Sequence, residues 1–179
     1  TTDNWVLQLN AAEYFTFQHM TIKATGASYG RAVEFTNGAH NNILAGNIIE
    51  TSTTSTSSNF AGIYTTSSND NNNKVIGNEI IGGYYGIYWY GSSSTSRGYN
   101  LVVENNAIHS FYYYGVNIAY TDSLRLISNF INNRSGSGSV YGARIYYCSF
   151  IEVLKNDIQV AGSSTHYGMY LYYNHGTAI

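Results

Sequence analysis

Proline is absent from the 179 residues, and cysteine occurs once, at Cys148. A strand inside a sheet uses every backbone N–H in its ladder, so a chain without proline is suited to uninterrupted strand pairing. A single cysteine excludes an internal disulfide and cannot by itself form a cysteine-based metal site. We therefore interpret Cys148 as a small buried apolar side chain.

Charge is also scarce, since only 10% of the residues are charged and the formal net charge is -2. The basic surface that nucleic-acid binding requires is missing. The eight Lys and Arg residues do not cluster, which argues against a polybasic membrane patch. No apolar run approaches the roughly 18 residues of a membrane-spanning helix. We expect neither a nucleic-acid partner nor membrane insertion.

Helical periodicity is missing as well, and a repeat takes its place. A motif close to aromatic-Gly-x-x-apolar recurs with its glycines 24 to 32 residues apart, and a motif close to Asn-x-Ile falls between its copies. Turn-forming runs of Gly, Ser, Asn and Thr separate them. The first motif centres on Gly30, Gly62, Gly86, Gly115, Gly142 and Gly168, and the second on Asn47, Asn78, Asn106, Asn129 and Asn156.

Short strands that repeat at about 27 residues describe a chain that climbs one strand spacing, about 4.8 Å, per repeat. The pattern predicts an all-β fold, a single right-handed parallel β-helix (β-solenoid) of about six coils. The two motifs resemble the PbH1 repeats of right-handed parallel β-helices, a class that includes pectate lyases, polygalacturonases, NosD-like proteins and phage tailspikes. The resemblance implies the fold and an extracellular, carbohydrate-associated setting. It implies no single activity, because this repeat serves catalytic and non-catalytic proteins alike.

Neither end of the sequence shows a polar capping repeat, and the repeat is still running at the last residues. We expect one domain over residues 1–179 that is a segment of a larger protein, with further coils or flanking domains at both ends. The first residues lack the basic start of a signal peptide. Residues 133–135, Asn-Arg-Ser, match a glycosylation sequon in a turn.

Period-two alternation assigns the faces of each strand. Aliphatic residues lie two positions after each motif Asn, and positions one and three after each motif Gly are also inward. We expect the Asn column to form a ladder of stacked amides. We expect each motif Gly to adopt a backbone conformation that a Cβ would disfavour. The aliphatic column after Asn comprises Ile49, Ile80, Ile108, Ile131 and Ile158.

Tyrosine is the most distinctive residue, with 19 copies. The column directly before Gly is predicted to be a structural ring stack, because coils one strand spacing apart suit offset stacking. That column comprises Tyr29, Tyr85, Tyr114, Tyr141 and Tyr167, interrupted by Ala61. Tyrosines two and four positions after Gly face outward, either as structural surface or as a platform for sugar rings. These candidate ligand-binding residues are Tyr64, Tyr88, Tyr90, Tyr146, Tyr170 and Tyr172.

Catalytic groups are difficult to find. Hydrolysis needs paired carboxylates, and lyase chemistry needs carboxylate-bound calcium with a basic residue. The four aspartates fall in different registers: Asp3, Asp70, Asp122 and Asp157. The remaining acid and base candidates are Glu79, Glu104 and His109, beside an outward polar column of Glu50, His109, Asn132 and Gln159 interrupted by Ile81. A solvated strand edge explains the same residues, and Arg125, Arg144, Glu152 and Lys155 fit salt-bridged surface. We expect no metal site and no cofactor.

The leading functional hypothesis is a non-catalytic carbohydrate-binding or adhesive module, extracellular or on the cell surface, with a polysaccharide or glycan surface as its partner. It depends on the outward tyrosines and on the missing catalytic set. A polysaccharide lyase or glycoside hydrolase fragment is one alternative. A structural spacer in a large surface protein is the other.

Overall fold

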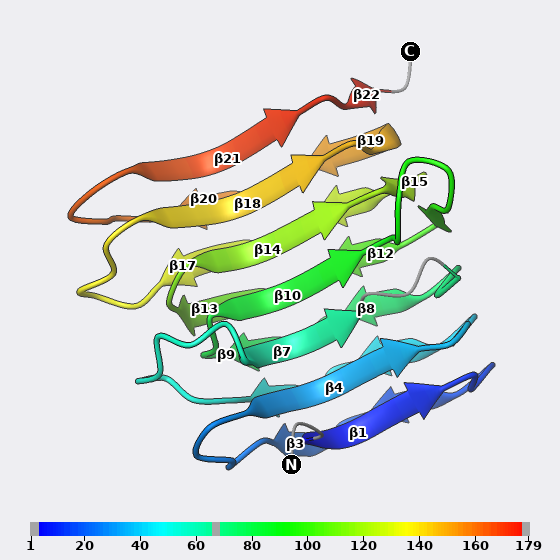
Figure 1. Cartoon of the computed structure of the whole chain (residues 1–179), viewed down its shortest axis with the longest axis horizontal. Coiled ribbons are helices and arrows are strands. Elements are labelled where there is room, and N and C mark those ends of the chain that lie inside the picture. The colour runs from blue at the N-terminus through cyan, green and yellow to red at the C-terminus, as the bar shows by residue number, and fades with distance from the viewer. Residues whose placement is uncertain (1–3, 66–68, 177–179) are drawn as a thin grey trace.

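The computed structural model describes residues 4–65 and 69–176 and has the predicted architecture, a parallel β-solenoid of about six turns. In Figure 1 the chain runs left to right along the front, returns behind and climbs from the N- to the C-terminus, which makes the solenoid right-handed. Its described residues contain no helix, so none of them forms one capable of crossing a membrane. Asp3 and Thr66, a residue of an outward column, lie outside the described residues.

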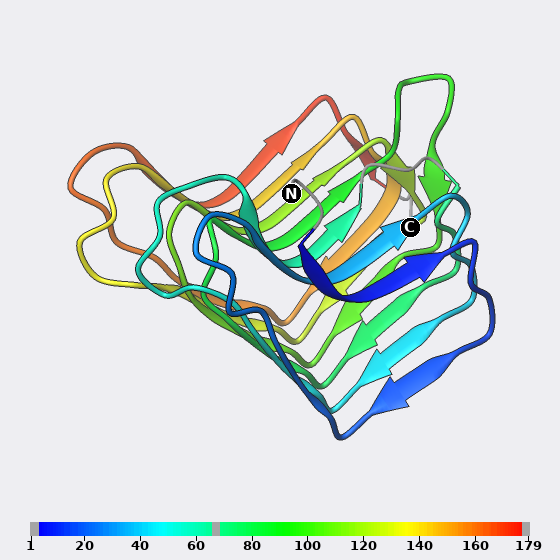
Figure 2. The ribbon, with the colours of Figure 1, turned by 60° about the horizontal axis from the view of Figure 1, so that its bottom comes forward.

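Each coil contributes one strand to each of three parallel sheets, which Figure 2 shows stacked around a shared interior. The first sheet has the longest strands: β1 (Trp5–Asn10), β4 (Gly30–Thr36), β7 (Phe60–Thr65), β10 (Tyr85–Tyr90), β14 (Tyr114–Ala119), β18 (Val140–Tyr146) and β21 (His166–Tyr172). The second comprises β2 (Thr16–Gln18), β5 (Ile43–Ala45), β8 (Lys74–Ile76), β12 (Val102–Glu104), β16 (Arg125–Ile127), β19 (Ser149–Leu154) and β22 (His175–Gly176).

The third sheet closes the coil: β3 (Thr21–Lys23), β6 (Ile48–Glu50), β9 (Glu79–Ile81), β13 (Ala107–Phe111), β17 (Phe130–Asn133) and β20 (Asp157–Gln159). A two-stranded ribbon of β11 (Gly98–Tyr99) and β15 (Thr121–Asp122) lies at the corner between the first and second sheets. Loops between the third and first sheets reach far from the body at the left of Figure 2. The uneven loops explain the variable repeat length.

The core consists of the predicted aliphatic columns. In the middle coils these side chains are fully buried, as at Val103 and Ile108, and Trp89 packs against Phe35 with ring centroids 5.1 Å apart. Leu171, predicted to face inward, is 51% exposed because β21 is the last described strand of the first sheet and no further coil covers it. Cys148 is fully buried, as predicted, and burial raises the pKa of its thiol to about 11.

The register of the first turn differs from the prediction. Gly30 pairs with Phe60 rather than with Gly62, so Arg31 takes the place in the column that was predicted for Tyr29. The chain is therefore shifted by two residues at β4. A shift of two residues keeps each side chain on the same face of the sheet. The inward and outward pattern in the sequence is the same for both registers, so it could not distinguish them.

The motif glycines are needed for a close approach and not for an unusual backbone conformation, so that expectation was wrong. None of the five glycines from Gly62 to Gly168 that carry the motif has a positive φ. A Cβ built on Gly115 would lie 2.5 Å from the carbonyl oxygen of Gly142 and 2.6 Å from Cγ2 of Ile131. The first sheet therefore packs against the third with no room for a side chain from Gly62 to Gly142, whereas Gly168 in the last coil has space for a Cβ.

The Asn column forms the predicted ladder. The backbone N–H and Nδ2 of Asn106 both donate to Oδ1 of Asn129 at 3.0 Å, and Nδ2 also donates to the Val75 carbonyl at 2.9 Å. The same pattern repeats at the other buried ladder residues. A second, shorter ladder joins the backbone N–H of Asn42 to Oδ1 of Asn73 at 2.9 Å, and the sequence repeat did not reveal it.

Candidate functional site

The first sheet lies at the front of Figure 1. Its outer face carries tyrosine rings that contact one another from coil to coil. All tyrosines except Tyr14, Tyr29 and Tyr99 belong to one connected set of ring contacts, which we call the tyrosine face. It extends from β7 to the end of β21. Because its tyrosines come from successive coils, the parallel register of the solenoid holds the rings in line.

The column directly before Gly is stacked, as predicted. Ring centroids lie 5.4 Å apart between Tyr85 and Tyr114, 5.2 Å between Tyr114 and Tyr141, and 5.1 Å between Tyr141 and Tyr167. Each inner ring therefore has its two faces covered by neighbouring rings. Its edge and hydroxyl remain for contact with a ligand, so a sugar cannot lie flat on it.

The six candidate ligand-binding tyrosines all lie on this face and are also in mutual contact. Tyr88 stacks on Tyr64 at 4.9 Å and on Tyr90 at 5.8 Å. Tyr90 and Tyr146 come from the coils on either side of Ala119. Their ring centroids lie 6.1 Å apart, so the two rings cover Ala119. Ala119 is consequently fully buried although its side chain points outward. Tyr170 and Tyr172 stack on each other at the last coil.

Two further tyrosine columns flank the strands and were missed. Tyr84 stacks on Tyr113 at 5.1 Å at one end, while Tyr120 and Tyr147 stack at 5.1 Å at the other. Tyr173 continues the second column. Their spacing in the sequence equals the repeat length, so counting one residue beyond each strand would have found them.

Arginine also reaches into the tyrosine face. The Arg144 guanidinium lies 4.3 Å from the ring centre of Tyr146, and its Nη1 lies 3.4 Å from the Tyr114 hydroxyl. Such cation–π contacts are stronger where water is partly excluded. Arg144 was expected in a salt bridge, but its contacts are aromatic. Arg125 does bind Glu152, with Nε and Oε2 2.7 Å apart.

Packing among the rings keeps the phenols protonated. Burial raises the pKa of Tyr114 to about 12, although the nearby charge of Arg144 acts in the opposite direction. Burial also raises the pKa of Tyr85, Tyr88 and Tyr146, and neighbouring tyrosines contribute to each increase. The tyrosine face is therefore neutral, apart from its arginines, at ordinary pH.

The raised phenol pKa values predict a fold that is sensitive to alkali. In the unfolded chain these tyrosines lose their protons near the ordinary phenol pKa of 10.0, whereas in the folded chain the pKa of Tyr114 is about 12. The folded state binds the proton more tightly, so its stability is complete below about pH 10 and falls as pH rises toward 12. Urea unfolding at a series of pH values measures this. Tyr114→Phe should give a shallower decline, and a pH-independent stability above pH 10 would contradict the prediction.

The acid and base candidates meet only in part. His109 Nε2 lies 3.0 Å from Glu79 Oε1 across β9 and β13, in an exposed position. Glu104 belongs to β12 in the second sheet, and its described hydrogen-bond partner is Asn105. The contact of this pair involves one carboxylate, whereas glycoside hydrolysis needs two.

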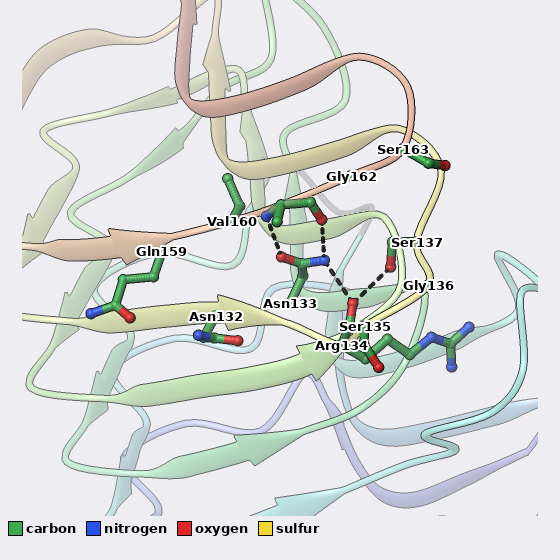
Figure 3. A pocket seen from close by; sticks show the side chains of 11 residues that line it. Asn132, Asn133, Arg134, Ser135, Gly136, Ser137, Gln159, Val160, Gly162 and Ser163 are labelled. Carbon is green, nitrogen blue, oxygen red and sulfur yellow. Dashed lines mark hydrogen bonds between the residues drawn. The ribbon is translucent and has the colours of Figure 1, made fainter.

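A hollow of about 730 Å³ lies beside the C-terminal end of the predicted polar column, which pairs in register as expected. Figure 3 shows its polar lining, with Asn132 and Gln159 on one side and two loops on the other. The sequon residue Asn133 is held by both ends of its amide: Nδ2 donates to the carbonyls of Arg134 and Ala161, and Oδ1 accepts from the Ala161 N–H. Glycosylation replaces one hydrogen of Nδ2 and would therefore remove one of the two bonds that it donates.

The part of the chain that the structure describes holds no group of three His, Cys, Asp or Glu side chains that could bind a metal ion. Asp70 is buried and accepts from the backbone N–H of Ala39 at 2.7 Å, and Asp122 pairs with Arg97 at 2.7 Å. The chain matches no known protein-family model and no curated protein sequence. The tyrosine face is therefore the most extensive candidate site.

Proposed function

We propose that the chain is a non-catalytic carbohydrate-binding or adhesive module of an extracellular or cell-surface protein, and that the tyrosine face is its binding surface. The observation that carries the proposal is the continuous set of partly exposed phenol rings across the widest sheet. Large exposed aromatic surfaces on soluble domains usually mark binding sites. A phenol offers apolar ring edges and a hydroxyl, which match the C–H groups and hydroxyls of a sugar.

The orientation of the rings favours a ligand that lies along the solenoid. Successive coils present equivalent rings about one strand spacing, about 4.8 Å, apart. The hydroxyl of Tyr88 has no hydrogen-bond partner among the described residues and belongs to a half-buried ring. A polysaccharide running across the coils would meet phenol hydroxyls from several successive coils. Weak contacts to successive sugars add up to a useful affinity when those sugars belong to one polysaccharide chain.

The proposal also covers the repeat type and what adjoins the two ends of the solenoid. We take the repeats to be of PbH1 type, with further coils or domains adjoining both ends. Apolar side chains on the terminal coils support this, since Phe15 near one end and Leu171 near the other are about half exposed. An exposed coil end invites strand addition.

A glycan array tests the proposal, followed by affinity measurements with any hit for Tyr88→Phe and Tyr170→Ala. Tyr88→Phe keeps the stacked ring and removes the hydroxyl, so we expect a loss of about 1 kcal/mol, or about fivefold in affinity. Tyr170→Ala should lower affinity at least as much. Tyr99→Phe is the matched control, because Tyr99 is exposed but lies outside the tyrosine face.

Binding that survives both changes would contradict the proposed surface. Unsaturated products or new reducing ends from the same glycans, abolished by Glu79→Gln or His109→Ala, would favour the lyase or hydrolase alternative. If the glycans are neither bound nor cleaved, the structural spacer is the alternative that remains.

A further inference from the structure

Among the described residues, Arg144 and Arg134 are the two arginines without a carboxylate partner, and Arg144 also lacks the carbonyl partners that Arg134 has. Arg97 and Arg125 pair with carboxylates at 2.7 Å, and Arg31 pairs with Glu34. Arg134 donates to the carbonyls of the loop that contains Ser55. Within residues 4–65 and 69–176, Arg144 contacts only aromatic groups of the tyrosine face.

The carboxylate in its own outward column is too distant to neutralise it. That column runs from Glu34 through Tyr64, Tyr88 and Asn117 to Arg144, one residue per coil. Four strand spacings correspond to about 19 Å. This exceeds the Debye length of about 8 Å at physiological ionic strength. Glu34 is moreover engaged by Arg31 and by Nε2 of Gln8.

The guanidinium retains free donors. It has five N–H groups, and its one hydrogen bond to a described residue runs from Nη1 to the Tyr114 hydroxyl. A planar fork of this kind binds carboxylate or sulfate oxygens two at a time. The Tyr146 ring beneath it holds the guanidinium in place and limits its hydration.

Asn117 supplies a second unsatisfied group next to Arg144. It pairs in register with Arg144 from the neighbouring strand, its side chain is 3% exposed, and its Oδ1 has no hydrogen-bond partner among the described residues. A buried acceptor without a partner costs free energy, so a donor that reaches it is favoured. A sugar hydroxyl is such a donor once the side chains that cover Asn117 move aside.

We propose that Arg144 and Asn117 form an anion subsite within the tyrosine face, which selects polysaccharides that carry carboxylate or sulfate groups. The anionic group binds the guanidinium, and an adjacent sugar hydroxyl donates to Asn117 Oδ1. The subsite rests on the proposed function, because it names the class of glycan that the tyrosine face binds. It also predicts that binding weakens as salt is added.

Affinity for matched polymers tests the subsite in the full chain. Carboxymethylcellulose is compared with hydroxyethylcellulose, and dextran sulfate with dextran, so that the two pairs separate carboxylate from sulfate. We expect at least one anionic polymer to bind about tenfold more tightly than its neutral partner, which corresponds to one charge-assisted hydrogen-bonded pair. Arg144→Gln should remove that preference. Arg144→Lys, which keeps the charge but loses the fork, should retain part of it.

Arg125→Gln is the control, because Arg125 is exposed on the second sheet and lies outside the tyrosine face. Circular dichroism of each variant checks folding, and Arg144→Lys still tests the fork if Arg144→Gln does not fold. Equal binding of charged and neutral polymers, unchanged by Arg144→Gln, would overturn the subsite and leave the proposed function intact. An equal loss in Arg125→Gln would also overturn it. Binding of no polymer would overturn both proposals.

Discussion

Asn106→Ala is expected to lower the free energy of unfolding by about 3–5 kcal/mol, since each buried polar group left without a partner costs about 1–3 kcal/mol. The change removes the acceptor of the Asn78 backbone N–H, at 2.9 Å, and the donor to the Val75 carbonyl. It also breaks the middle of a ladder in which every amide polarises the next. The sites are dry, because Asn78 and Asn106 are almost fully buried.

Urea denaturation measures this loss, with Asn132→Ala as the matched control. Asn132 lies on an outward, partly exposed position of β17, and no side-chain hydrogen bond holds it among the described residues. Its replacement should change stability by less than about 0.5 kcal/mol, as for most surface sites. Similar effects of the two substitutions would show that the ladder does not stabilise the coils.

Gly115→Ala is expected to lower the free energy of unfolding by about 1–3 kcal/mol or more, the usual range for an overpacked core. The new methyl group would lie 2.5 Å from the Gly142 carbonyl oxygen. Backbone cannot rotate away as a flexible side chain can, so the neighbouring coil has to move. Differential scanning calorimetry of the variant measures the lower melting temperature.

Gly138→Ala is the control for backbone entropy. A Cβ at Gly138 has open space, and this glycine does not have a positive φ. Alanine at such a site stabilises by about 0.4–1 kcal/mol by restricting the unfolded chain. The two glycines should therefore respond in opposite directions. A neutral or stabilising Gly115→Ala would contradict the close approach of the first and third sheets.

The fold was predictable because the repeat encodes it twice, in the Gly motif and in the Asn motif. Columns such as that of Ile108 and Asn106 follow directly from period-two alternation. The register at Gly30 was not predictable, since a shift of two residues leaves the inward and outward pattern unchanged. The role of the motif glycines was missed for another reason. The distance between the first and third sheets depends on how the whole coil packs, and the local sequence does not show it.

The candidate site was predictable in position but not in detail. The outward tyrosines lie where alternation places them, whereas the covering of Ala119 by Tyr90 and Tyr146 depends on side-chain rotamers across three coils. Glu79 and His109 meet because they belong to adjacent strands of one sheet. Glu104 belongs to another sheet because the chain turns between it and β13.

A crystal structure of the protein with an oligosaccharide taken from the glycan array tests the central claim most directly. We predict electron density for the sugar on the outer face of the first sheet, over β10, β14 and β18, in contact with the hydroxyl of Tyr88 and the guanidinium of Arg144. Density instead in the hollow beside Gln159, or at the Glu79–His109 pair, would contradict the assignment of the tyrosine face as the binding surface.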